Sequence, residues 1–347
     1  MAKVIAVMGG NEGGSILRPG VVTSVGSLPH VDPAEAARFV LEAHPALPAA
    51  PQLPRRSPLE GMIAQAARGI HGVWVDESGA LDLDVDRLDP AAPVAACFDA
   101  DSHAGLLGFL DAVAGRTAPA KFQLTGPITL ALALVDAGAP VGVALDVAAN
   151  AVRLHAASLM SLVRRTLPDA PLLVVLDEPG LARATGDRSL GLDIEDVVDR
   201  LSSALAVLEE EAVTGVHCCA ATEWQLASSA GATVLSMPVE REWLLAGAGA
   251  INAHLERGGW IAWGVVPTHE PLGTDPDRLW RRLSTTWCEL VQAGCDPIQL
   301  RTQALVTPAC GLAGHGVSQA SQALQLASKV AERVTDQAVA VRLSAGA

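Results

Sequence analysis

Short apolar runs alternate with longer amphipathic stretches along most of the chain. From about residue 118 each apolar run is followed by a helix-type pattern, as in Leu172–Leu176 followed by 194–211. Continuously apolar strands that alternate with amphipathic helices are typical of a parallel sheet covered by helices. Runs of this kind lie near residues 21, 51, 121, 172, 214, 233, 260 and 298, the last at 298–300. Eight such units predict an α/β fold, a single (β/α)8 TIM barrel.

The N-terminal part departs from this rhythm. Residues 1–18 contain two Gly-Gly pairs and little periodicity, so we expect a loose leader before a barrel domain at 19–340. Asp32 followed by Pro33 predicts the N-cap and the first residue of a helix that ends near residue 43. Gly72–Leu83 alternates apolar and acidic residues around a Ser-Gly turn, which predicts an inserted antiparallel hairpin. Further helices are predicted at 141–167, 222–230, 242–256, 277–292 and 318–334.

Composition narrows the range of partners. The 347 residues are half apolar, enough for a barrel-sized core, and 24 basic against 38 acidic residues give a net charge of −14. This charge argues against a surface that binds nucleic-acid phosphates, and no apolar run is long enough to span a membrane. The sequence therefore predicts a soluble, cytoplasmic protein whose partner is a small molecule or another protein. Six cysteines are few for this length, which predicts reduced thiols.

A candidate metal site lies where the apolar run at 214–216 ends. His217 and Cys219 are two residues apart, so in extended backbone their side chains point to the same side while that of Cys218 points away. Zinc accepts imidazole and thiolate ligands, and Cys310, in the loop after the last predicted strand, is a candidate third ligand. The alternative is that His217 and the two cysteines are ordinary buried core residues.

Other polar residues follow predicted strands, where a barrel binds its substrate. Ser27 follows the first strand and Asp177 and Glu178 the fourth, while His269 follows the seventh. A carboxylate at Asp177 can bind an ammonium group, accept a proton or cap a helix. Glu178 is expected to act as a helix cap. His269 is either a general acid, because its pKa is ordinarily near neutrality, or a solvated loop histidine.

In these residues the chain resembles the C-terminal catalytic barrel of cobalamin-independent methionine synthase, within the barrel superfamily that includes uroporphyrinogen decarboxylase. The resemblance covers roughly residues 20–335, and the order of its motifs is more specific than any one of them. The matching pieces are Thr23-Ser24-Val25-Gly26-Ser27-Leu28-Pro29, Leu124-Thr125-Gly126-Pro127-Ile128-Thr129, Leu176-Asp177-Glu178-Pro179, His217-Cys218-Cys219, Gly264-Val265-Val266-Pro267-Thr268-His269-Glu270-Pro271 and Pro308-Ala309-Cys310-Gly311-Leu312.

The resemblance implies a zinc-dependent methyltransferase that transfers a methyl group to the sulfur of homocysteine, forming methionine. His217, Cys219 and Cys310 match the family's zinc ligands. Asp177 matches the carboxylate that holds the substrate's amino group, Ser27 matches a residue of the substrate-binding loop, and Glu60 is the candidate for a second ammonium contact. His269 matches a proposed proton donor.

Two departures from the family pattern change the expectation. Ser236 occupies the place of the family's glutamate ligand, so Glu240 is the candidate fourth ligand unless the site holds three. The family also carries a second, N-terminal barrel for which this chain has no room. We therefore expect a methyl donor other than the usual methyl-folate, such as a methylated corrinoid or a corrinoid protein. The alternatives are a decarboxylase of the uroporphyrinogen type and a barrel that has lost catalysis and acts as a binding protein.

Overall fold

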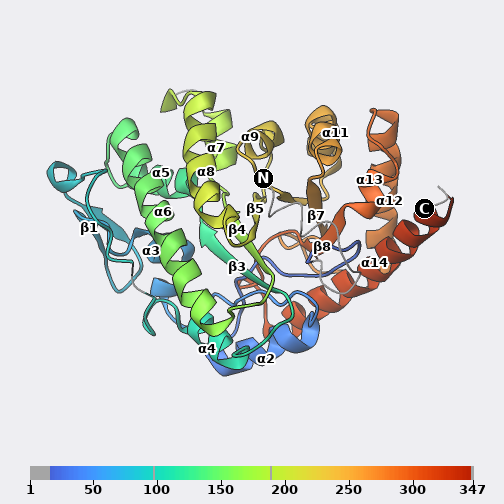
Figure 1. Cartoon of the computed structure of the whole chain (residues 1–347), viewed down its shortest axis with the longest axis horizontal. Helices are drawn as coiled ribbons and strands as arrows, with labels where there is room; N and C mark the ends of the chain where they lie inside the picture. Colours follow the sequence, from blue (N-terminus) through green and yellow to red (C-terminus); the bar gives the residue numbers. More distant parts are fainter. Residues whose placement is uncertain (1–15, 97, 188–189, 345–347) are drawn as a thin grey trace.

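A curled parallel sheet forms the centre of the molecule (Figure 1). The structure is a computed structural model that describes residues 16–96, 98–187 and 190–344. Six strands follow one another in chain order across the sheet, and helices cover its outer face. The strands are β3 (Ala120–Thr125), β4 (Leu172–Asp177), β5 (Val213–His217), β6 (Val234–Pro238), β7 (Trp260–Val266) and β8 (Ala304–Pro308).

The predicted strands near residues 121, 172, 214, 233 and 260 are confirmed, and the strand predicted at 298–300 is wrong. That segment begins the short helix α13 (Gln299–Thr302), and β8 starts at Ala304. The reason is local, because Asp296 accepts hydrogen bonds from the backbone N–H groups of residues 298 and 299 at 2.7 and 2.9 Å. A side chain that satisfies these N–H groups favours a helical turn over an extended strand.

Two further segments bridge the edges of this sheet. Near residue 22 the chain forms an isolated parallel bridge with Val306 of β8, and near residue 49 it forms one with Lys121 of β3. A third bridge joins Ser27 to Gln52 and so links the two segments. The strands predicted near residues 21 and 51 are therefore present as single bridges, and the regular sheet has six strands.

The register of the sheet aligns polar residues at one edge. Asp177 of β4 pairs with Thr125 of β3 on one side and with His217 of β5 on the other, and His217 pairs with Ser236 of β6. All four residues are at or near the carboxyl ends of their strands. Below them the same face is apolar, since Leu173, Val175, Val234, Ala262 and Leu305 form one buried cluster.

Amphipathic helices pack their apolar sides on the outer face of the sheet. The Asp32 carboxylate caps α2 (Pro33–Ala43) as predicted, accepting from the N–H groups of residues 34 and 35. The helix predicted at 242–256 is interrupted at Gly247, which ends α10 (Arg241–Ala246) and precedes α11 (Ala248–Glu256). The other helices are α4 (Ala104–Ala112), α5 (Pro127–Asp136), α6 (Val141–Thr166), α7 (Leu181–Gly186), α8 (Ile194–Glu209), α9 (Trp224–Ser229), α12 (Pro276–Gln292) and α14 (Val317–Ser344).

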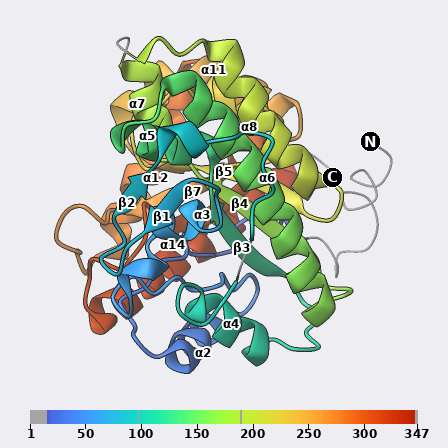
Figure 2. The ribbon, with the colours of Figure 1, turned by 90° about the vertical axis from the view of Figure 1, so that its left-hand side faces the viewer.

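The predicted hairpin is confirmed as β1 (Val73–Val75) and β2 (Leu81–Leu83). It lies outside the sheet next to α3 (Met62–Ala67), which follows the short helix η1 (Pro58–Glu60) (Figure 2). A second short helix, η2 (Val85–Arg87), follows the hairpin. Among the described helices, none combines the length and the apolar character that a membrane span requires.

The leader predicted at 1–18 lies mainly outside the described residues. Its last part is described, and Ile16 and Leu17 are buried against the apolar cluster on the inner face of the sheet. A second, much larger cluster of buried apolar side chains fills the space between the sheet and the helices and extends from Leu28 to Val334. The domain boundaries at 19 and 340 stay a prediction.

Candidate metal centre and its surroundings

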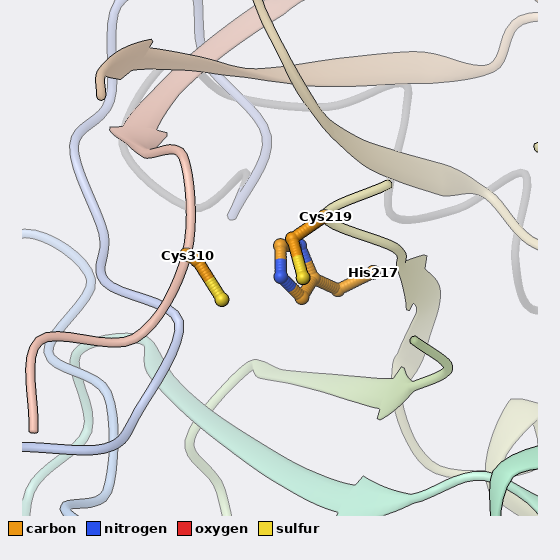
Figure 3. A group of neighbouring side chains, drawn as sticks. All are labelled: His217, Cys219 and Cys310. Atoms are coloured by element: carbon orange, nitrogen blue, oxygen red, sulfur yellow. The ribbon is translucent and has the colours of Figure 1, made fainter. Parts of the chain in front are cut away.

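His217, Cys219 and Cys310 converge at the carboxyl edge of the sheet (Figure 3). One nitrogen of the imidazole and the two sulfur atoms all lie within 4.8 Å of one another. His217 is the last residue of β5 and Cys219 follows it by two residues, whereas Cys310 lies two residues beyond β8. The tertiary structure thus brings together the three residues that the sequence singled out as zinc ligands.

Backbone hydrogen bonds hold both loops that carry these residues. The carbonyl of His217 accepts from the N–H of Glu178 at 2.7 Å, and the N–H of Cys218 donates to Ser236 at 3.2 Å. On the other side, residue 309 donates to residue 266 at 2.9 Å, and residue 312 donates to residue 27 at 2.8 Å. Each loop is therefore fixed by the neighbouring strands, which limits the movement of the side chains that face each other.

The His217 imidazole is oriented for binding through Nε2. The ring is buried, with 3 % of its surface exposed, and Nδ1 is 2.9 Å from the Ser236 hydroxyl. With Nδ1 donating to Ser236, Nε2 keeps its lone pair. Within the described part of the chain, this buried Nε2 has no hydrogen-bond partner. A buried acceptor without a partner is costly, so the arrangement favours a ligand at this atom.

The three cysteines of this region differ in their surroundings. Cys219 and Cys310 are partly exposed, and the hydrogen bond between them lowers the pKa of the Cys219 thiol and raises that of Cys310. Cys218 is fully buried in the apolar cluster behind the sheet, and burial raises the pKa of its thiol to about 11. The expected alternation is confirmed, because Cys218 points away from the group formed by its two neighbours.

The spacing of the three residues fits a zinc ion. Zinc binds sulfur at about 2.3 Å and imidazole nitrogen at about 2.0–2.1 Å, so two ligand atoms of a tetrahedral ion lie roughly 3.5–4 Å apart. The limit of 4.8 Å among these atoms is close to that spacing. One nitrogen and two sulfur ligands are a soft set suited to zinc, and they leave a fourth position for a substrate or water.

Asp177 lies next to His217 on the same face. It has 6 % of its surface exposed, and its Oδ1 has no hydrogen-bond partner among the described residues. Burial raises the pKa of the Asp177 carboxyl, while the nearby His217 and Lys121 act in the opposite direction. A buried carboxylate oxygen without a partner is suited to bind a cationic group.

Lys121 is a polar group of this interior that we did not predict. Its ammonium donates to the carbonyl of Val25 at 2.7 Å and to the Gln123 side chain at 3.0 Å. With Asp177 and His217 it lines a small cavity on the inner face of the sheet. The signal was available in the sequence, because positions 121, 123 and 125 are polar and alternate with apolar residues in β3.

This buried lysine predicts a pH dependence of stability. Burial lowers the pKa of Lys121 from 10.5 to about 8, with Asp177 opposing the shift. Between about pH 8 and 10.5 the unfolded chain binds the proton and the folded chain does not, so unfolding becomes harder as the pH rises. Relative to the Lys121→Met variant, the protein is expected to gain up to about 3 kcal/mol of unfolding free energy across that range.

Urea unfolding of both proteins at pH 7.5, 8.5 and 9.5 measures this difference. Lys329, which lies on α14 and for which no such burial applies, provides the matched control as Lys329→Met. A constant difference between the protein and its Lys121→Met variant at the three pH values would contradict the expectation.

Ser27 lies against the loop that carries Cys310. Its backbone carbonyl accepts from Leu312, and its hydroxyl lies 1.9 Å from the point that a Cβ atom on Gly311 would occupy. Gly311 therefore lets the Ser27 hydroxyl approach the loop, since a side chain there would force that hydroxyl to turn away. The structure places Ser27 beside the loop that carries Cys310. Its role in substrate binding stays a prediction.

Glu60 is not available as the predicted ammonium contact. Only 1 % of its surface is exposed, and its carboxylate accepts from the N–H groups of Leu53 and Gly105 at 3.0 and 3.4 Å and from Arg56 at 3.1 Å. Burial raises the pKa of this carboxyl. The prediction is corrected because backbone N–H groups and a guanidinium already occupy both oxygens, so Glu60 ties loops together.

Glu240 is not part of the metal group either. β6 ends at Pro238, and Glu240 stands at the start of α10, where its carboxylate accepts from Arg282 of α12 at 2.7 Å. Ser236 is the residue of β6 that lies beside His217 in the sheet. The sequence analysis did not identify the role of this serine, whose hydroxyl is hydrogen-bonded to Nδ1 and so orients the imidazole.

His269 and Glu178 complete the set of sequence candidates. His269 is exposed in the loop after β7, and within the described residues no hydrogen bond holds its ring. Glu178 is fully buried and accepts from the backbone of Ile128 and Thr129 and from the Thr129 hydroxyl, so it caps α5 as expected. Burial raises the pKa of the Glu178 carboxyl to about 7.

Comparison with known proteins shows similarity of fold. No protein-family model matches the sequence, and no curated protein matches it. Two solved structures align over nearly the whole chain. A methyltransferase from Methanosarcina mazei has a TM-score of 0.56 at 16 % identity and covers 94 % of this chain and 96 % of its own. A putative vitamin-B12 independent methionine synthase from Listeria monocytogenes has a TM-score of 0.56 at 14 % identity, covering 92 % and 98 %. The chain has the α/β fold found in these two proteins.

Proposed function

We propose that the chain is a zinc-dependent S-methyltransferase with homocysteine as the methyl acceptor, built on a single (β/α)8 barrel. The two bridged segments near residues 22–27 and 49–52 would be its first and second strands, since they connect β8 to β3. The observation that carries the proposal is the convergence of His217, Cys219 and Cys310 around a buried imidazole nitrogen that has no partner among the described residues. The similarity of fold to a methyltransferase and to a putative methionine synthase supports it.

The proposed ligand set consists of His217, Cys219 and Cys310. A zinc ion bound there would lower the pKa of a coordinated thiol, so that an acceptor thiol becomes a thiolate at neutral pH. Ser236 holds the imidazole in the orientation that leaves Nε2 free. Because Glu240 pairs with Arg282, the fourth position is left to the substrate sulfur in this proposal.

Other residues of the same edge would bind the rest of the acceptor. The unpartnered Oδ1 of Asp177 is proposed to accept from the amino group of homocysteine, one strand away from His217. Ser27 is proposed to contact the amino-acid end of the substrate from the side of the Cys310 loop. His269, on the exposed loop after β7, is proposed as the proton donor to the departing methyl carrier.

For the methyl donor we propose a methylated corrinoid, free or bound to a carrier protein. The proposal is tested by incubating the zinc-loaded protein with homocysteine and either methylcobalamin or methyltetrahydrofolate, and measuring methionine by mass spectrometry. Methionine formed from methylcobalamin alone is expected. Equal turnover with methyltetrahydrofolate would overturn the choice of donor and keep the reaction.

The same preparation separates the alternative functions. Protein that is purified without zinc and cannot take it up would contradict the proposed methyltransferase function and favour a decarboxylase of the uroporphyrinogen type. Bound zinc without methionine formation from either donor would favour a barrel that binds a ligand without turning it over.

A further inference from the structure

A second cavity lies on the side of β3 that faces away from β4, where β3 and the segment at 49–52 separate. The segment at 49–52 pairs with β3 at Ala49, and residue 50 donates to the carbonyl of Lys121 at 2.9 Å. Further along, Gln52 pairs with Ser27 instead. Among the described residues the carboxyl half of β3 thus has a regular strand partner on one side, β4. A cavity occupies the space on the other side.

Among the residues that the structure describes, the lining of this cavity contains no charged side chain. It consists of aliphatic and aromatic side chains, three glutamines, a threonine and two histidines, from the segment at 50–52, β3, α3, α4 and α6. A mainly apolar wall with a few polar groups is typical of small-molecule sites. A charged ligand would lose its hydration here without gaining a partner of opposite charge, which is costly.

The two histidines are the groups of this wall that can direct a ligand. His103 and His155 are both 7 % exposed, and burial lowers the pKa of each, that of His103 to about 4, so both rings are neutral at pH 7. Nδ1 of His103 is 2.8 Å from the Ser102 hydroxyl, and Nε2 of His155 is 3.2 Å from the carbonyl of Arg68. For the second nitrogen of each ring, no hydrogen bond is found to any other described residue.

Aromatic rings accompany these imidazoles. Phe98 contacts His103 edge-on with ring centroids 4.8 Å apart, and Phe122 of β3 is fully buried at the wall. Such a wall favours a planar ring over a flexible chain, because ring faces and edges interact in these geometries. The Gln52 and Gln65 side chains are hydrogen-bonded to each other at 2.9 Å and so offer a preorganised polar edge.

The cavity is close to the candidate metal centre but separate from it. Thr125 lines the cavity and pairs with Asp177, which in turn pairs with His217. Two strand spacings separate Thr125 from His217, a distance of about 10 Å. Neither His217, Cys219 nor Cys310 lines the cavity.

We propose that this cavity is a binding site for an uncharged, aromatic small molecule whose polar substituent hydrogen-bonds to His103 and His155. The inference goes beyond the methyltransferase and does not depend on it, because binding here requires none of the proposed zinc ligands. The neutral wall selects against ions, and the two imidazoles select for a ring that carries a hydroxyl or carbonyl group.

Three probes of similar size and different charge test the proposal: phenol, benzoate and benzylammonium. Binding to the full-length protein at pH 7 is measured by ligand-observed NMR titration. Phenol is expected to bind at least about tenfold more tightly than either ion, because burying an unpaired charge costs more than 1.4 kcal/mol. Equal affinity for the three probes, or no binding of phenol, would overturn the proposal.

Two kinds of variant locate the binding. Ala66→Phe fills the cavity from α3 and is expected to abolish phenol binding; Cys310→Ser is the control and is expected to retain it. If Ala66→Phe does not fold, as judged by thermal unfolding, His103→Leu and His155→Leu decide the matter. Each is expected to weaken phenol binding about tenfold through the loss of one hydrogen bond. Undiminished binding in the variants that fold would show that phenol binds elsewhere.

Discussion

The unaltered protein is expected to bind one zinc ion per chain, and the Cys310→Ser variant is expected to retain less than about a tenth of it. A serine hydroxyl stays protonated at neutral pH and is a poor ligand for a soft metal site, so two of the three proposed ligands remain. Loss of a ligand also removes the geometry that the acceptor thiol needs. The rate of methionine formation is expected to fall more than about 100-fold. Replacing a residue that only hydrogen-bonds to a metal ligand already lowers metal affinity or activity by about 10–100-fold.

Elemental analysis of the purified protein, together with the methionine assay, measures both effects. Cys288→Ser is the matched control, because Cys288 is an exposed free thiol on α12 outside the group. It is expected to keep its zinc and its activity. Unchanged zinc in Cys310→Ser, or an equal loss in the control, would contradict the assignment of Cys310 as a ligand.

The second large effect is expected for Asp177→Asn, which should raise the KM for homocysteine about 100-fold at near-constant kcat. The buried Oδ1 of Asp177 has no hydrogen-bond partner among the described residues, and an amide cannot replace its charge. Removing one partner of a buried charge pair costs about 2–5 kcal/mol, which corresponds to a factor of 30 or more. The fold should persist, because asparagine keeps the size of the side chain.

Comparison of two acceptors shows whether the lost contact is the one to the amino group. 4-Mercaptobutanoate has the thiol and carboxylate of homocysteine and lacks its amino group. The unaltered protein is expected to prefer homocysteine strongly, and Asp177→Asn to lose that preference. The exposed Asp136, changed to asparagine, is the control. A preference that survives in Asp177→Asn would assign the residue a structural role.

The local pattern of the sequence was sufficient for most of the elements. Apolar runs followed by amphipathic stretches identified five of the six regular strands, and the Asp-Pro pair at 32–33 identified the start of α2, because periodicity and capping act over a few residues. The same locality explains the wrong strand at 298–300. There the Asp296 side chain, two residues before the segment, accepts hydrogen bonds from its first backbone N–H groups and favours a helical turn.

The candidate site likewise combines residues that a local sequence pattern relates to one another with a residue that the tertiary structure brings to them. His217 and Cys219 are two residues apart on one strand, so strand alternation alone placed them on one side and Cys218 on the other. Cys310 was a candidate third ligand because it lies in the loop after the last predicted strand, and it also matches a ligand of the family that the chain resembles. The curling of the sheet from β5 to β8 brings it to the other two residues.

The sequence by itself determined the order of the strands, the direction of their side chains and the types of residue at their carboxyl ends. Only the tertiary structure shows which polar groups are free: Glu60 accepts from Gly105 and Glu240 from Arg282, both distant in the chain, whereas Nε2 of His217 and Oδ1 of Asp177 have no partner in the described chain. Hydrogen-bond partners distant in the chain depend on how the sheet curls and the loops pack. Residue type and local spacing therefore do not predict these partners.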